Sequence, residues 1–380
     1  MSEPSRDQVL DALVDICGPD YARAGRSVDT VAGRQAAFVA VPATTQAAAD
    51  TMRLAADRGL ATMPRGSGSK IDWGVPRGGL DLLVDTGRLA GMWHHDVVGQ
   101  TAEVGTGTPV RALQAALALR GQRLPVDPPS RTATVGGMLA VNESGPLRHR
   151  FGTPAEHVER VSYVDRAGQP AESDGEGDRP GIAEIAGVLI SAKVRLQPLP
   201  PARRWVGVAV PSPLQIPKLA GEVADLEPSA IEVDLPGDAP AGMLAVLFEG
   251  DEESVANRAE RLAGAWGAGS AVAAVAPAWW GRYPFERTDV ALRLSVSPAD
   301  LPAALYALGD AAGAPLPVRG SAGLGTVHAV LPGSTPPDRV ERILDGVRHV
   351  LMARNGHAVV VSAPIHLARQ IEMAGRRDLF

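Results

Sequence analysis

Residues 126–154 read VDPPSRTATVGGMLAVNESGPLRHRFGTP and decide the fold. They contain a proline pair, the glycine pair Gly136-Gly137, an Asn-Glu-Ser-Gly turn and a Phe-Gly-Thr sequence around one short apolar run. So many turn residues exclude an ordinary helix or strand, and the stretch is too apolar for a disordered linker. Glycine pairs let the main chain approach a ligand closely, and consecutive N–H groups in such turns bind anions. The stretch therefore indicates a ligand-binding loop.

A second glycine-rich turn, Pro64–Lys70 (PRGSGSK), lies upstream of this loop. It follows a predicted strand, Leu60–Met63. The helix before that strand is expected to begin at a cap on Thr44 or Thr45 and to end at Arg58. A glycine turn after a strand–helix–strand unit is where backbone amides meet phosphate. Alone, the turn fits an ordinary connection better, and Lys70 lacks the GxxxxGK spacing of a nucleotide P-loop. Together, the two turns predict a bound dinucleotide between them.

The composition is that of an ordinary globular protein. The chain has 380 residues, of which 45% are hydrophobic and 21% charged, with a formal net charge of −6. This charge gives no basic footprint for nucleic acid, and the apolar runs are too short to span a membrane. The N-terminus shows no signal-peptide pattern, and a single cysteine, Cys17, excludes a disulfide framework or a cysteine-ligated metal or iron–sulfur site in this chain alone. A cytoplasmic protein is the simplest expectation.

The pattern of predicted strands and helices indicates an α+β protein in three parts. Residues 1–27 contain an N-terminal helix, and residues 28–200 alternate short strands and helices. The Leu199-Pro200-Pro201 sequence is a typical boundary. Residues 201–380 then read as two ferredoxin-like βαβ sets that form one antiparallel sheet, with a final strand and helix. We expect the acidic, glycine-rich residues 166–180 to be a mobile loop.

Several other motifs have an ordinary structural interpretation. His94-His95-Asp96 is interpreted as an exposed turn, because no third metal ligand is evident. Gly320–Gly325 is predicted to be a hairpin turn, because it precedes a strand and not a helix. The Arg148-His149-Arg150 cluster fits a solvated surface and a carboxylate site equally well. The aromatic residues near 279–285 either line a substrate face or anchor one domain on another. No catalytic residue follows from spacing alone.

Three segments in order resemble the FAD-binding subunit of glycolate oxidase. They are PRGSGSKIDWG, DTGRLAGMWHHDVVGQTAEVGTGTPVRALQAAL and LPVDPPSRTATVGGMLAVNESGPLRHRFGTP. The wider group is the flavoproteins with a vanillyl-alcohol-oxidase (PCMH-type) FAD domain. The resemblance covers residues 28–200 and continues less closely through 279–298 and 356–375. It implies a two-subdomain FAD-binding fold followed by a ferredoxin-like cap domain with a C-terminal return segment.

The resemblance also implies which residues hold FAD. The first turn would cradle the pyrophosphate through backbone amides, and the second loop would follow it toward the isoalloxazine. The first turn has serine where relatives with covalent flavin have histidine, so FAD would be bound non-covalently. The matching positions are Arg65, Gly66, Ser67, Gly68, Ser69, Pro128, Pro129, Thr134, Gly136, Gly137, Asn142, Ser144, Gly145, Phe151, Gly152, Thr153 and, on a strand beside the adenine, Ile190.

The implied activity is oxidation of a small, glycolate-like 2-hydroxy acid, with electrons passed to a separate iron–sulfur subunit. Arg148, Arg150 and Arg282 are the candidates for binding the substrate. Such a protein would be cytoplasmic and would reach the inner membrane only through its partner. Two departures favour an alternative, a non-catalytic scaffold or regulatory relative. Residues 171–186 replace a Lys-Asn-Val-Ala-Gly-Tyr-Asp-like segment, and an Asn-Pro-Gly tail is missing where the chain reads GRRDLF (375–380).

Overall fold

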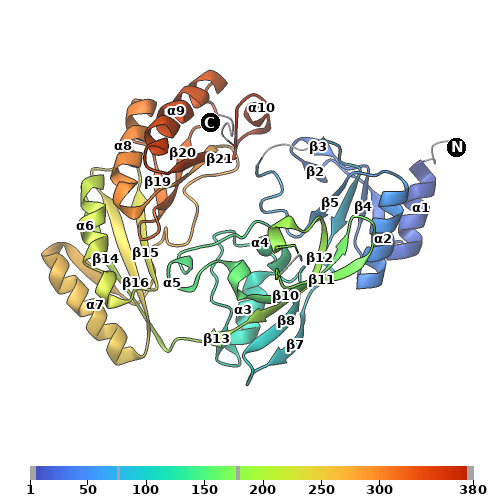
Figure 1. Ribbon diagram of the computed structural model, residues 1–380, viewed down its shortest axis with the longest axis horizontal. Helices are drawn as coiled ribbons and strands as arrows, with labels where there is room; N and C mark the ends of the chain where they lie inside the picture. Colours follow the sequence, from blue (N-terminus) through green and yellow to red (C-terminus); the bar gives the residue numbers. More distant parts are fainter. Residues whose placement is uncertain (1–5, 75–77, 177–179, 375–380) are drawn as a thin grey trace. The chain divides into compact units, whose positions relative to one another are not determined.

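The computed structural model describes residues 6–74, 78–176 and 180–374 (Figure 1). It divides into two compact units. The first unit contains Met1–Asp72, Arg77–Ser144 and Thr153–Leu199, and the second contains Trp73–Pro76, Gly145–Gly152 and Pro200–Phe380. The C-terminal GRRDLF sequence lies outside the described residues.

The first unit begins with a four-stranded sheet in the order β1-β4-β6-β5. Strands β4, β6 and β5 are parallel, and β1 is antiparallel to β4. The predicted helix after Thr44 is confirmed, because the Thr44 hydroxyl accepts the Ala47 N–H and caps it. The N-terminal helix α1 and the helix α2 after Thr44 bury apolar side chains, including Leu13 and Met52, against this sheet. The elements are α1 (Arg6–Cys17), β1 (Ala22–Ala24), β2 (Thr30–Val31), β3 (Arg34–Gln35), β4 (Phe38–Ala40), α2 (Thr45–Asp57), β5 (Thr62–Arg65) and β6 (Leu82–Asp85).

The rest of the first unit is a five-stranded antiparallel sheet in the order β11-β10-β12-β8-β7. Helices α3 and α4 bury Leu113, Leu117 and Met138 in the core that they share with this sheet. The elements are β7 (Met92–Asp96), β8 (Thr101–Gly105), α3 (Val110–Ala118), β9 (Gln122–Arg123), α4 (Val135–Ala140), η1 (Pro154–His157), β10 (Val158–Asp165), β11 (Pro170–Ser173), η2 (Ile182–Glu184), β12 (Gly187–Arg195) and β13 (Gln197–Pro198).

Two predictions for this sheet are wrong in detail. The expected mobile loop at 166–180 contains strand β11, because Pro170–Ser173 pair with Val161–Val164 of β10; residues 177–179 lie outside the described part. His94-His95-Asp96 belong to strand β7 and do not form a turn. There His95 Nε2 lies 2.7 Å from Gln122 Oε1, a pairing that local sequence could not reveal.

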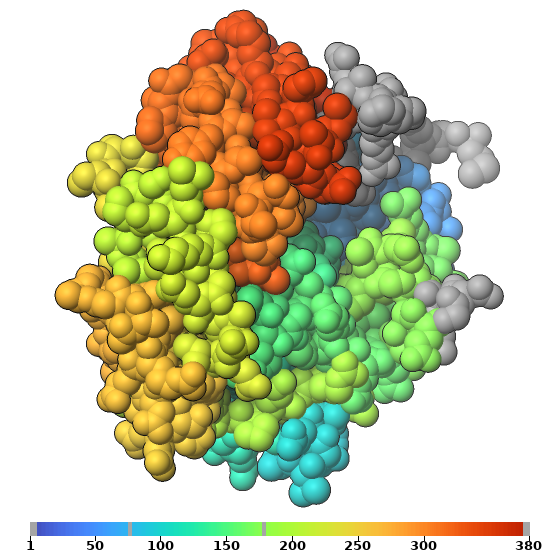
Figure 2. Space-filling model, turned by 60° about the vertical axis from the view of Figure 1, so that its left-hand side comes forward, coloured from blue at the N-terminus to red at the C-terminus, as the bar shows by residue number. Residues whose placement is uncertain are grey.

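The second unit confirms the predicted antiparallel sheet. Its eight strands lie in the order β17-β14-β16-β15-β19-β20-β18-β21. Helices α6 to α9 share the apolar core of this sheet. Helix α7, gold in Figure 2, exposes the charged residues Glu252, Glu253 and Glu260 on its outer side. The Gly320–Gly325 turn joins β19 to β20 as a hairpin, as predicted. The elements are α5 (Arg148–Phe151), β14 (Ala202–Val210), η3 (Pro213–Gln215), α6 (Ile216–Gly221), η4 (Ala224–Leu226), β15 (Ala230–Leu235), β16 (Gly242–Gly250), α7 (Glu252–Trp266), η5 (Gly267–Gly269), β17 (Ser270–Ala273), β18 (Val290–Ser295), η6 (Pro298–Asp300), α8 (Leu301–Ala312), β19 (Val318–Ser321), β20 (Thr326–Leu331), α9 (Pro337–Met352), β21 (His357–Ser362) and α10 (Ile365–Ala368).

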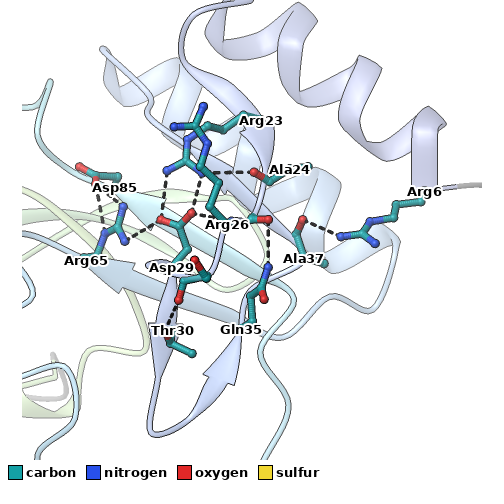
Figure 3. A network of polar contacts seen from close by, with 12 residues as sticks. Arg6, Arg23, Ala24, Arg26, Asp29, Thr30, Gln35, Ala37, Arg65 and Asp85 are labelled. Carbon is teal, nitrogen blue, oxygen red and sulfur yellow. Dashed lines mark hydrogen bonds and ion pairs between the residues drawn. The ribbon is translucent and has the colours of Figure 1, made fainter.

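A buried carboxylate, Asp29, fixes the end of β5. It accepts hydrogen bonds from Arg23 Nη1 at 2.6 Å and from Arg65 Nη1 at 3.1 Å (Figure 3). Arg65 also binds Asp85 at the end of the neighbouring strand β6, at 2.9 Å. The hydrogen bonds from Arg23, with those from the Arg26 amide and Arg65, hold the pKa of Asp29 well below its usual range. The last residue of β5 is therefore anchored by two carboxylates.

The variant Asp29→Asn should lower the free energy of unfolding by about 3 kcal/mol at neutral pH, because two arginines then face an uncharged group. The pKa of Asp29 is lower in the folded than in the unfolded chain. Its contribution is therefore present above the unfolded value of about 4 and is lost as the pH falls through the folded value. Urea unfolding should show the difference between wild type and variant shrinking below about pH 4.

The control for this experiment is Asp50→Asn, which removes the partner of Arg53 in an ion pair whose carboxylate side chain is 35% exposed. That change should cost less than about 1 kcal/mol. An Asp29→Asn effect that is equally large in acid and at neutral pH would contradict the assignment.

Candidate functional site

The turn after β5 offers main-chain groups and not side-chain charge. The guanidinium of Arg65 is already bound by Asp29 and Asp85. The next four amide N–H groups, those of residues 66–69, donate to no acceptor in the part of the chain that the structure describes. Successive N–H groups that have no acceptor within the protein carry partial positive charge and favour an anion. This segment is the strongest anion-binding candidate in the first unit.

The first turn touches the second loop at Gly66. A Cβ atom at this position would overlap the Oγ1 atom of Thr134. The same Thr134 hydroxyl caps α4 by accepting the Gly137 N–H at 3.2 Å. The residue must be glycine because Thr134 occupies the space of its side chain.

The glycine pair of the second loop serves packing. The Gly136 N–H donates to the Thr106 carbonyl at 2.8 Å, and a Cβ on Gly136 would lie 2.7 Å from Thr106 Cβ. The Gly137 N–H is taken up by Thr134. Neither amide is therefore unsatisfied, in contrast to those of the first turn. We conclude that this pair lets the loop approach β8, and that its N–H groups already have partners.

The Asn-Glu-Ser-Gly turn is held by its own side chains. Asn142 has a positive φ of 48°, and its Oδ1 accepts the Ala155 N–H at 3.0 Å. The Ser144 hydroxyl donates to the Asn142 carbonyl at 3.2 Å. Thr153 begins η1 with a capping box, in which Glu156 Oε1 accepts both the N–H and the hydroxyl of Thr153 at 2.9 Å. These bonds connect the end of the second loop to the segment before β10.

Sequence reasoning missed one buried ion pair in this region. Lys70, at the end of the first turn, pairs with Glu143 of the second loop. Their side chains are only 8% and 2% exposed. Burial lowers the pKa of the Lys70 ammonium, and the charge of Glu143 opposes that shift. The sequence signal for Lys70 is its place directly after a glycine turn, which by itself suggests only a P-loop lysine.

The remaining predicted positions differ in their surroundings. Pro128 and Pro129 are half-buried in the loop before α4. Ile190 is only 1% exposed and packs in the core with residues of α1 and α2, and its carbonyl accepts the Thr106 N–H at 2.9 Å, so its side chain is not open to a ligand. Ile182 and Ile185, from the segment that departs from relatives, pack against the core around α4. The Ser173 hydroxyl closes that segment by donating to the Pro180 carbonyl at 2.7 Å.

Gly145, Phe151 and Gly152 belong to the second unit, with the predicted substrate arginines. Leu147 and Phe151 pack with Ala230, Leu247 and Trp280 in a small apolar cluster. His149 packs against Gly323, where a Cβ would lie 2.6 Å from its ring, and burial lowers its pKa. Gly152 ends α5 with a φ of 78°.

The arginine candidates fall into two groups. Arg148 and Arg282 are exposed, and their guanidinium groups meet no acceptor among residues 6–74, 78–176 and 180–374. Their segments lie close together, because a Cβ on Gly281 would lie 3.9 Å from Pro146 Cδ. Arg150 instead donates to the Glu227 carbonyl at 3.5 Å. Arg148 and Arg282 are therefore the better candidates for an incoming carboxylate.

Aromatic residues of the same unit pack on one another. Trp280 meets Trp205 edge-on at 6.2 Å and Trp279 at 5.8 Å between ring centroids. Phe285 stacks on Tyr283 at 4.9 Å, and Trp73 lies 5.7 Å from Phe285. Because Trp205 belongs to β14, these contacts hold the loop before β18 against the sheet.

The described residues contain no group of three histidine, cysteine, aspartate or glutamate side chains that could hold a metal ion. Within the same residues, no helix has the length and apolar character needed to cross a bilayer.

Comparison with known proteins agrees with this geometry. Residues 36–173 match the FAD binding domain family. The glycolate oxidase subunit GlcE of Escherichia coli (strain K12) is 34% identical over 114 residues, which are 30% of this chain and 32% of that protein. The D-lactate dehydrogenase of Archaeoglobus fulgidus is 27% identical over 158 residues, 41% of this chain and 35% of that protein. The matched regions span about a third of the length of these relatives.

Solved structures extend the likeness to nearly the whole chain. An alkyldihydroxyacetonephosphate synthase has a TM-score of 0.71 at 15% identity, covering 93% of this chain and 80% of that one. The BBE-like 1 protein of Physcomitrella patens has a TM-score of 0.68 at 15% identity, covering 92% and 89%. At these identities the likeness concerns the fold.

The amides of residues 66–69, which have no acceptor among the described residues, could receive the phosphates of FAD. The close approach of Gly66 to Thr134 holds these amides against the second loop. Residues 36–173 therefore match an FAD-binding domain, with FAD as the cofactor, and the chain has the α+β fold of the PCMH-type flavoproteins.

Proposed function

We propose that this chain is an FAD-dependent oxidoreductase subunit that oxidises a small 2-hydroxy acid. The observation that carries the proposal is the row of four unsatisfied amides at residues 66–69 within an FAD-binding domain. Two relatives of that domain are named for glycolate and D-lactate, which are both 2-hydroxy acids. Their common chemistry supports an alcohol beside a carboxylate as the substrate.

In this proposal the first turn binds the FAD pyrophosphate through main-chain N–H groups. Arg65 positions the turn and does not touch the phosphates, because its guanidinium is occupied by Asp29 and Asp85. Thr134, Asn142 and Ser144 hold the second loop in the shape that continues the site. Serine in the first turn, where relatives with covalent flavin have histidine, supports non-covalent binding. When bound, FAD supplies the acceptor for a hydride equivalent from the substrate carbon.

The substrate carboxylate would be received by Arg148 and Arg282. Both guanidinium groups lack an acceptor among the described residues, and a guanidinium binds a carboxylate with two parallel hydrogen bonds. Arg150, already bonded to a carbonyl, would contribute only long-range charge. The role of this chain's residues is thus to orient the acid by its carboxylate, so that its carbinol carbon is the atom presented for oxidation.

An iron–sulfur subunit is the proposed electron acceptor. One cysteine cannot ligate such a cluster, so the electrons would leave through a partner. The relative named as a glycolate oxidase subunit is by its name part of a larger assembly. A cytoplasmic location, with membrane contact only through that partner, belongs to the same proposal.

A non-catalytic scaffold is the second candidate. It is favoured by side chains that lie between the two loops, namely Thr134 against Gly66 and Lys70 against Glu143. The segment at 180–186, folded onto the core around α4, replaces one that relatives carry. In this alternative the first turn keeps its shape without redox chemistry.

The purified chain should be yellow, or should become yellow when FAD is added, and glycolate or D-lactate should bleach its flavin absorption without oxygen. Acetate and propionate are matched controls, because they keep the carboxylate and lack the hydroxyl to be oxidised. Flavin that is bound but not bleached by any 2-hydroxy acid would support the scaffold. A protein that takes up no FAD, with or without a co-purifying partner, would contradict the enzyme.

The variant Gly66→Ala should fold less stably, by about 1–3 kcal/mol, because its methyl group overlaps Thr134 Oγ1. It should also bind FAD at least about tenfold more weakly, since the adjacent amides must shift. FAD titration followed by flavin fluorescence, at a temperature where the variant is folded, measures the second effect. Gly181→Ala is the control, because its φ is −60° and its nearest new contact is 3.8 Å away. Undiminished FAD affinity in Gly66→Ala would show that the turn does not bind the cofactor.

A further inference from the structure

The Lys70–Glu143 pair joins the two loops of the proposed FAD site at a second point. The Lys70 ammonium, at the end of the first turn, contacts Glu143 Oε1 and also donates to the Ser130 hydroxyl at 2.8 Å. Both partners belong to the second loop. One side chain therefore holds the first turn to two places on the loop before and after α4.

The receiving carboxylate is itself fixed. Glu143 Oε1 also accepts the Ser130 N–H at 2.9 Å, and the Glu143 N–H donates to the Met138 carbonyl at 2.9 Å. The carboxylate thus bridges Ser130 and Lys70 from a main chain that is bonded to α4. Such a bridge cannot move without breaking several buried hydrogen bonds.

The four unsatisfied amides lie between two ionic anchors. Arg65 precedes them and is held by Asp29 and Asp85, while Lys70 follows them and is held by Glu143 and Ser130. A turn of two glycines and two serines has high conformational entropy when it is not restrained. Ordering it during folding removes that cost from the later binding of a ligand.

Stability alone is a poor explanation for this pair. A buried ion pair often contributes no more to stability than apolar side chains of the same size, because both charges lose their hydration. Its better-attested effect is to fix one arrangement among several. Here the arrangement is the register of the first turn against the second loop.

We propose that Lys70, Glu143 and Ser130 form a positioning clamp that holds the 66–69 amides ready for the FAD pyrophosphate, while Lys70 itself does not bind the phosphates. The proposal rests on the function proposed above for the first turn. The alternative chemistry is a lysine that leaves Glu143 and binds a phosphate directly. The two make opposite predictions for the loss of Glu143.

The first test is FAD affinity in Lys70→Met, Glu143→Gln and the double variant. Glu143→Gln keeps an oxygen for the Ser130 N–H and removes only the charge. Each single substitution should raise the dissociation constant for FAD about tenfold. The dissociation constant of the double variant should not exceed the larger of the two single-variant values, because both substitutions break the same contact. The salt dependence of the dissociation constant should not change in Lys70→Met, because no phosphate contact is lost.

The matched control is Lys193→Met. Lys193 pairs with Glu159 at 2.9 Å in the same unit, but the two side chains are 39% and 31% exposed. Its FAD affinity should equal that of the wild type. Tighter FAD binding by Glu143→Gln would overturn the clamp, because a freed ammonium would then be the phosphate ligand. The clamp would also be overturned if Lys70→Met lowered the melting temperature and left the FAD affinity unchanged, because the pair would then contribute to stability alone.

The second test needs no FAD and so separates this proposal from the function. Cys17 is the single cysteine of the chain, so a nitroxide placed by Ser67→Cys in a Cys17→Ser background reports on the exposed first turn alone. Its spectrum should be that of an ordered turn, and should become mobile when Lys70→Met is added. An equally ordered label in both proteins would sink the clamp even if FAD binds. An ordered label in a protein that refuses FAD would instead sink the proposed function.

Discussion

The missing side chain at Gly66 is the constraint on which the proposed site depends. Thr134 fills that space and at the same time caps α4, so the first turn and the second loop are shaped against one another. Any residue larger than glycine would separate them or unseat the cap. The glycine at position 66 therefore has a direct three-dimensional reason.

On either side of this contact, charged side chains hold the first turn in position. Arg65 is bound to two carboxylates, and Lys70 is bound to Glu143 and Ser130. Neither cation is available to attract an anion without losing a buried partner, and this would cost several kcal/mol. Attraction is left to the amide dipoles of the turn, which need no counter-charge and no reorganisation. Charged side chains thus hold the turn in place, and main-chain amides are left to bind the ligand.

Local patterns were sufficient for most of the fold. The cap at Thr44, the hairpin at Gly320–Gly325 and the antiparallel sheet of the second unit all follow from turn residues and periodicity. Strand β11 was missed because four residues at a sheet edge, among glycines and acids, carry too little pattern. The histidines of β7 were misplaced because their partner, Gln122, lies beyond local sequence.

The site was predictable where glycine spacing defines it and not where distant residues meet. Glu143 is 73 positions from Lys70, and no periodicity links them. The association of residues 145–152 with the second unit was equally hidden, because it depends on Leu147 and Phe151 meeting Ala230 and Leu247. Tertiary contacts of this kind have no signature in one sequence.

Recognition through the main chain has a consequence for how such a protein changes over generations. The hydroxyl groups of Ser67 and Ser69 meet no partner in the described part of the chain. Substitutions at these two positions can therefore be tolerated while the main-chain amides stay in place. Gly66 and Thr134 are not free, since each is shaped to the other. Lineages that share this turn can therefore lose nearly all recognisable identity around it and still keep its geometry.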